Sequence, residues 1–81
     1  MSILKGLGLF NLPPRIRDHS MLHLTRLITA LDVEALEREH MSADGFIEGL
    51  AAARALTPAT IEALYVAINE VAADRLKELG V

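Results

Sequence analysis

His19 and His23 come nearest, by type and spacing, to a chemical site in this chain. Two imidazoles four residues apart on a helix lie on one face, where both could bind one metal ion. The third histidine, His40, follows Glu37 by three residues and so forms one Glu-x-x-His pair. Di-metal helical bundles use that pair twice, with two further glutamates from other helices. Only a symmetric oligomer could complete such a set, so we expect no metal or other cofactor. A metal-binding helical oligomer is kept as a third hypothesis.

Other chemistry has little support in the composition. The chain of 81 residues contains no cysteine, which excludes a thiol nucleophile and a cysteine-based zinc site. Most of its carboxylates fall where exposed helix faces are expected, and a helical chain of this length has little room for a reaction pocket. The glycine-containing run GLGLF lacks the preceding strand that a phosphate-binding loop requires. We therefore expect this protein not to be an enzyme.

One stretch carries a resemblance to a known motif, and its sequence is LAAARALTPATIEAL, residues 50–64. An alanine-rich helix, a turn and a Thr-Pro-x-Thr-Ile start are similar to the helix-turn-helix of bacterial repressors. Thr57, Pro58, Thr60 and Ile61 match the start of the recognition helix. The resemblance implies a DNA-binding regulator in which Thr60 lies on the reading helix. Basic side chains elsewhere would then contact phosphate, namely Arg15, Arg17 and Arg26.

The same stretch departs from the motif at its turn and in its charge. Leu56 runs directly into Thr57, without the usual glycine-plus-apolar turn. The expected reading helix carries Glu62 near its start and has no cation before Arg75. Phosphate contacts dominate DNA affinity, and an acidic reading helix opposes them. We expect no nucleic-acid binding, and a regulator using residues 50–64 is the alternative hypothesis.

Residues 1–12 form an apolar N-terminal arm with the sequence MSILKGLGLFNL. Its two glycines weaken any helix there, by roughly 1 kcal/mol each. The apolar run is too short to span a membrane, no cleavage site follows it, and Lys5 alone is a thin anchor for a lipid surface. The arm could pack on its own chain, reach another protomer or partner, or lie on a membrane. We expect the second, with Phe10 as the anchor beside Leu4, Leu7 and Leu12.

Apolar spacing predicts an all-α protein, a compact bundle of about four helices. Residues 14–31 present one apolar face that includes Ile28 and Leu31, and Asp32 can cap a helix over 33–40. Ser42 can cap a third helix over 43–56. Thr57 and Pro58 open a fourth over 58–79, and Gly80 supplies its stop. Residues 13–81 would form a single helical domain.

Charge is unevenly distributed along the chain. Residues 1–31 hold four basic side chains against Asp18 alone, whereas residues 32–81 hold four basic and ten acidic ones. The basic N-terminal part and the acidic remainder could pair head-to-tail between protomers, or the basic part could bind an acidic partner. The alternative is ordinary variation of charge over the surface of a short chain. Within 43–56, Gly45 and Gly49 lie on one side and would allow close approach of another backbone, from the same chain or from a second copy.

The composition favours self-association. The chain is 52% hydrophobic but only 4% aromatic, which is more apolar surface than one small core can bury. We expect a cytoplasmic, non-catalytic protein-protein interaction module, an adaptor, inhibitor or regulator that acts as a homo-oligomer. It would bind itself and another protein, and no membrane. Besides the arm, the residues expected at the interface are Ile61, Leu64 and Ile68.

Overall fold

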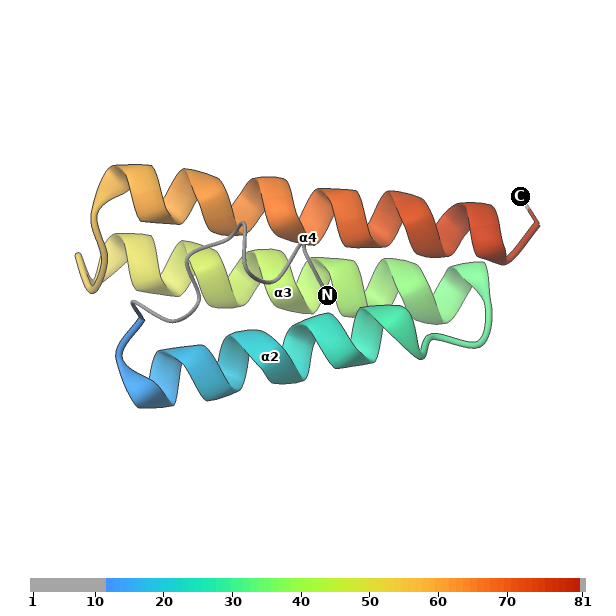
Figure 1. Ribbon diagram of the computed structural model, residues 1–81, viewed down its shortest axis with the longest axis horizontal. Coiled ribbons are helices and arrows are strands. Elements are labelled where there is room, and N and C mark those ends of the chain that lie inside the picture. The colour runs from blue at the N-terminus through green and yellow to red at the C-terminus, as the bar shows by residue number, and fades with distance from the viewer. Residues whose placement is uncertain (1–11, 81) are drawn as a thin grey trace.

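The computed structural model describes residues 12–80, which fold into three helices. They are α2 (Pro14–Ile28), α3 (Val33–Ala52) and α4 (Pro58–Glu78). Figure 1 shows them side by side, each antiparallel to the next, so that α2 starts at the end of the bundle where α3 meets α4. The expected all-α class is confirmed for this part of the chain, but the expected number of helices was one too many.

Helix α2 ends three residues earlier than expected, because the start of the next helix requires extended backbone. Asp32 lies at φ −150° and ψ 173°, and its carboxylate accepts a hydrogen bond from the Ala35 amide at 2.7 Å. The cap predicted at Asp32 is therefore confirmed, and the chain must leave α2 before it. As a result Leu31 is 86% exposed and Ile28 is 38% exposed, instead of lying on the inward face.

The two helices expected over 33–40 and 43–56 are one continuous helix, α3. Ser42 is a good N-cap in isolation, but no proline or glycine ends the helix before it. The buried residues of α3 are Leu36, Ala43 and Ile47, seven and four residues apart, which is the spacing of one helical stripe. A break at Ser42 would turn Ala43 and Ile47 away from Leu36, and burying this stripe outweighs a local cap.

The turn after α3 begins at Ala53, so this helix is also shorter at its C-terminus than expected. Arg54 has a φ of 54°, the left-handed conformation that usually belongs to glycine. Its amide donates to the Ala51 carbonyl at 3.1 Å, and the next amide, of Ala55, donates to the Leu50 carbonyl at 3.0 Å. These two bonds form a Schellman motif, which satisfies the last carbonyls of α3 at the cost of backbone strain at Arg54.

Helix α4 begins where the sequence predicts and ends one residue before the predicted end. The Thr57 hydroxyl accepts a hydrogen bond from the Thr60 amide at 3.2 Å, and Pro58 occupies the first turn, where a missing N–H costs nothing. At the other end Gly80 takes a φ of 81° and its amide donates to the Lys77 carbonyl at 3.0 Å. Both terminal signals are confirmed, because each depends only on local backbone chemistry.

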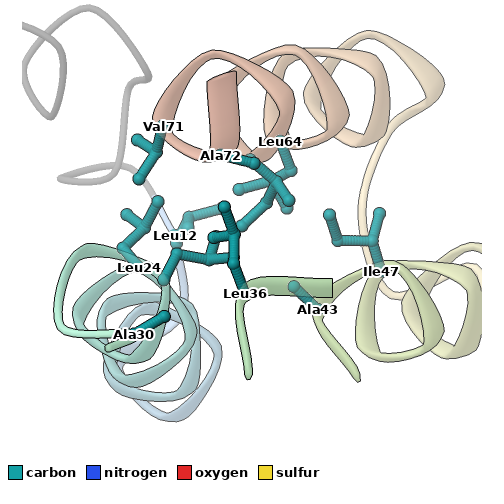
Figure 2. Packing of buried hydrophobic residues seen from close by; sticks show 11 residues of the cluster. Leu12, Leu24, Ala30, Leu36, Ala43, Ile47, Leu64, Val71 and Ala72 are labelled. Atoms are coloured by element: carbon teal, nitrogen blue, oxygen red, sulfur yellow. The ribbon is translucent and has the colours of Figure 1, made fainter. Parts of the chain in front are cut away.

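The core fills the space between the three helices. Figure 2 shows Leu24 of α2, Ile47 of α3 and Leu64 of α4 directed into this space, together with Leu12. Leu27 and Ile47 are its largest fully buried side chains. The small buried residues let the helices approach closely: Ala43, Ala67 and Ala72. No helix within residues 12–80 is long and apolar enough to cross a lipid bilayer.

Arg75 ties the far end of α4 to the loop that follows α2. Its Nε and Nη2 atoms donate to the Ala30 carbonyl at 2.9 and 2.7 Å, across 45 residues of sequence. The guanidinium lies just beyond the C-terminus of α2, where unpaired carbonyls carry partial negative charge and favour a cation. A third nitrogen, Nη1, lies 3.3 Å from Glu78. This contact fixes how α4 lies against the α2–α3 loop.

Candidate interaction surfaces

A shallow apolar groove of about 560 Å³ lies beside the α3–α4 turn. Its walls are half-buried Leu56, Ile61 and Tyr65, with Arg54 and Glu62 as charged neighbours. The Schellman turn and the Thr57 cap place these side chains together, because they bring α4 back alongside α3. The volume suits a small ligand or an inserted side chain, but the groove has no set of converging acid, base and nucleophile.

A second hollow, of about 250 Å³, lies between α3 and α4 nearer the other end of the bundle. His40 Nε2 and Asn69 Oδ1 lie 2.8 Å apart there, and the same nitrogen is 3.8 Å from Asp44 Oδ2. The other oxygen of that carboxylate, Oδ1, is buried without a hydrogen-bond partner within residues 12–80. Glu37 lines the same hollow. The ring of His40 thus links α3 to α4 rather than facing solvent freely.

The most buried titratable group is His23, in the contact between α2 and α3. Its ring is stacked on Phe46 with centroids 4.9 Å apart, and its side chain is only 8% exposed. Nδ1 has no hydrogen-bond partner among the described atoms. Burial lowers the pKa of His23 below its ordinary value of 6.5, the charges of Arg26 and His19 lower it further, and Glu39 opposes them. Folding therefore disfavours the charged form of this imidazole.

Ser20 and His23 line a cavity of only about 10 Å³ inside the bundle. This volume lies at the lower limit for one water molecule. The hydroxyl of Ser20 is already bonded to the Ile16 carbonyl at 2.7 Å. The cavity is a packing gap among α2, α3 and α4, too small for a substrate or cofactor.

The histidines and glutamate that could have formed a metal site lie on two sides of α3. His19 and His23 both contact Phe46, where α2 packs on α3, with His19 at a centroid distance of 6.0 Å. Glu37 and His40 line the hollow between α3 and α4. Within residues 12–80 no three histidine, cysteine or acidic side chains are close enough together to hold a metal ion.

Residues expected at an interface are distributed between the core and the groove. Leu12, Leu64 and Ile68 are buried in the chain's own core, at 6%, 3% and 4% exposure. Ile61 is half-buried and lines the groove beside the α3–α4 turn. The remaining arm residues named above lie outside the described residues: Leu4, Leu7 and Phe10.

The residues named for a nucleic-acid contact under the alternative hypothesis lie on two helices, α2 and α4. Arg15 and Arg26 are exposed on α2, whereas Arg17 is half-buried and lies 3.7 Å from Asp18. The Thr60 hydroxyl lies 2.9 Å from that of Thr57, within the α4 cap. Figure 1 shows α3 and α4 antiparallel along their length, whereas the two helices of a helix-turn-helix cross steeply.

Several exposed apolar side chains were missed by the sequence reasoning. Met41 on α3 is 75% exposed, Leu22 on α2 is 43% exposed and Val66 on α4 is 48% exposed. An added Cβ at Gly45 or Gly49 would meet nothing within 4 Å, so no described part of the chain packs on those glycines. The signal for Met41 and Leu22 was their helical position, more than 100° from the buried stripe of each helix.

The chain was compared with family models, curated proteins and solved structures, and no match was found in any of the three. Its function is therefore inferred from the surfaces described above.

Proposed function

We propose that this protein is a small, non-catalytic helical interaction module that works by binding other copies of itself and, through them, another protein. The observation that carries the proposal is the separation of charge between helices. Helix α2 holds three arginines against one aspartate. Helix α3 holds five acidic side chains against one arginine, and α4 holds four acidic against two basic ones. Each copy thus presents a basic helix and an acidic hairpin at separate places on its surface.

Within residues 12–80 the separation leaves charged side chains that have no ion-pair partner. The three arginine–carboxylate pairs and the His40–Asp44 contact within residues 12–80 join neighbours on the same helix, at most four residues apart. None of them links α2 to α3 or α4. Opposite charge on another molecule is the remaining way to pair such groups, and charge complementarity raises both the rate and the specificity of association.

Exposed apolar side chains beside these charges support binding rather than simple solubility. Leu22 lies among the basic residues of α2, and Met41 lies among the acidic residues of α3. Protein interfaces combine an apolar centre with a charged rim. The hollows contain no catalytic arrangement that would compete with this interpretation.

Light scattering on the protein as it elutes from a size-exclusion column tests the proposal directly. We expect its average mass to rise above that of one chain between about 1 and about 100 µM, the range in which small interfaces associate. A monomer across the whole range would contradict it. Sequence-dependent binding of duplex DNA, lost in a Thr60→Ala variant, would instead support a regulator that uses residues 50–64.

A further inference from the structure

We propose that the self-association proposed above occurs through two complementary helix stripes, one on α2 of one copy and one on α3 of the next. The basic stripe consists of Arg15, His19, Leu22 and Arg26, and the acidic stripe of Glu37, Met41, Asp44 and Glu48. Both have the spacing i, i+4, i+7, i+11. Eleven residues turn a helix through three turns and about 20°, so each set lies along one line of about 16.5 Å.

Both stripes are largely exposed, although His19 also lies against Phe46 of the same chain, Glu37 lines the α3–α4 hollow and Asp44 lies beside His40. All four basic-stripe residues are exposed, and in the acidic stripe only Asp44 is half-buried. Leu22 and Met41, the apolar members, are 43% and 75% exposed. Within residues 12–80, the terminal charges of the two stripes form no ion pair: Arg15, Arg26, Glu37 and Glu48.

The two stripes match when one helix runs antiparallel to the other. Arg15 then faces Glu48, and Arg26 faces Glu37. Between these ends, His19 faces Asp44 and Leu22 faces Met41. Every position meets its chemical complement, with an apolar contact near the centre and ion pairs at both ends.

The parallel alignment is poorer. It keeps the two Arg–Glu pairs at the ends, but it places Leu22 against the Asp44 carboxylate and His19 against Met41. Burying a carboxylate against an aliphatic side chain removes water without supplying a partner. The antiparallel alignment is therefore the one that the side chains specify.

The pairing must occur between copies rather than within one chain. Helix α2 contacts α3 through Phe46, against which both His19 and His23 lie. The members of the acidic stripe lie two to nine residues from Phe46, which places them about 140–180° around α3 from that contact. A chain's own α2 cannot reach the far side of its α3, but α2 of a second copy can.

The contact joins two different surfaces, so it is head-to-tail. Repeating it gives a ring if the rotation between copies closes, and an open chain if it does not. One helix-on-helix contact buries little area, which corresponds to weak, micromolar association. Its exposed ion pairs make the association sensitive to salt.

Reciprocal charge reversal tests this inference. An Arg15→Glu/Arg26→Glu variant carries acidic ends on both stripes, and a Glu37→Arg/Glu48→Arg variant carries basic ends on both. For each variant alone, the dissociation constant of self-association should rise by roughly tenfold or more, because like charges then face each other. An equimolar mixture should regain it, since each stripe of one variant complements the opposite stripe of the other.

Matched controls carry the same net charge change away from the stripes. Arg38→Glu/Lys77→Glu serves the first variant, and Glu70→Arg/Asp74→Arg serves the second; all four positions are exposed. Circular dichroism should show every variant folded. We expect both controls to associate as the unmodified chain does in sedimentation velocity.

The outcomes separate the two proposals. If the unmodified chain associates but the reversed variants behave like their controls, or the mixture stays dissociated, then the stripes are not the contact and self-association uses another surface. If the unmodified chain is monomeric throughout, the proposed function itself is wrong. The stripe pairing is supported only if each reversed variant loses self-association and the equimolar mixture regains it.

Discussion

Replacing Arg75 by methionine should destabilise the fold by about 2 kcal/mol. The substitution removes two charge-assisted hydrogen bonds to the Ala30 carbonyl, at 2.9 and 2.7 Å, while keeping an unbranched side chain of similar length. Hydrogen bonds to charged groups contribute about 1.5–3 kcal/mol, and Ala30 is only 6% exposed, so water replaces the lost donors poorly. The Arg75 side chain is itself 23% exposed, which keeps the expected loss below the sum of two full bonds.

The assay is thermal and urea unfolding followed by circular dichroism. For a chain of this size a loss of 2 kcal/mol lowers the Tm by about 8–16 °C. Lys77→Met is the matched control, because it removes an exposed cation from the same turn of α4 and should change stability by no more than about 0.5 kcal/mol. Arg75→Lys keeps the charge but loses the fork of donors, so its stability should lie between the other two.

If Arg75→Met and Lys77→Met unfolded at the same denaturant concentration, the contact with Ala30 would contribute nothing and the reasoning would be refuted. If Arg75→Lys and the unmodified chain unfolded at the same denaturant concentration, the positive charge alone would matter at this position. The first outcome would remove the long-range contact from the account of how α4 is fixed against the α2–α3 loop.

Three further predictions concern the backbone and the buried histidine. Gly45→Ala and Gly49→Ala should each stabilise the chain by about 0.5–1 kcal/mol in urea unfolding, because both lie in a helix with open space for a Cβ; destabilisation would mean that something packs on that face. Arg54→Gly should raise stability by up to about 1 kcal/mol by relieving the left-handed strain, and a lower Tm would show that the side chain contributes more than the strain costs. Because folding lowers the pKa of His23, the free energy of unfolding should be highest above the ordinary value of 6.5 and should fall as the pH drops through it; His23→Leu should flatten this slope between about pH 7.5 and 5, and an unchanged slope would contradict the assignment.

Local signals in the sequence were sufficient for the helix ends that depend on them. Asp32, Thr57 and Gly80 act through hydrogen bonds to residues at most three positions away, which a single sequence displays directly. Ser42 failed as a boundary because its competitor was the buried stripe that includes Ala43, and burial is decided by the rest of the chain. A local capping preference contributes less to stability than the continuous packing of a helix on its neighbours.

Contacts between residues far apart in the chain could not be predicted from the sequence. The Arg75–Ala30 contact spans 45 residues, and nothing in the local pattern of either residue indicates it. Leu64 and Ile68 were expected at an interface and are buried in the chain's own core, because periodicity does not tell whether an apolar face packs on its own chain or on another. The spacing of the acidic and basic stripes is visible in the sequence, but only the three-dimensional fold shows that most of their side chains are exposed.

Self-association through complementary charge is tested most directly by the average mass of the unmodified protein as a function of salt. Sedimentation equilibrium at about 100 µM protein, in steps from about 50 mM to about 0.5 M NaCl, covers the range over which exposed charges become screened. We predict an average mass well above one chain at low salt that falls toward the monomer mass at high salt. A mass that is independent of salt, or a monomer at the lowest salt, would contradict the account.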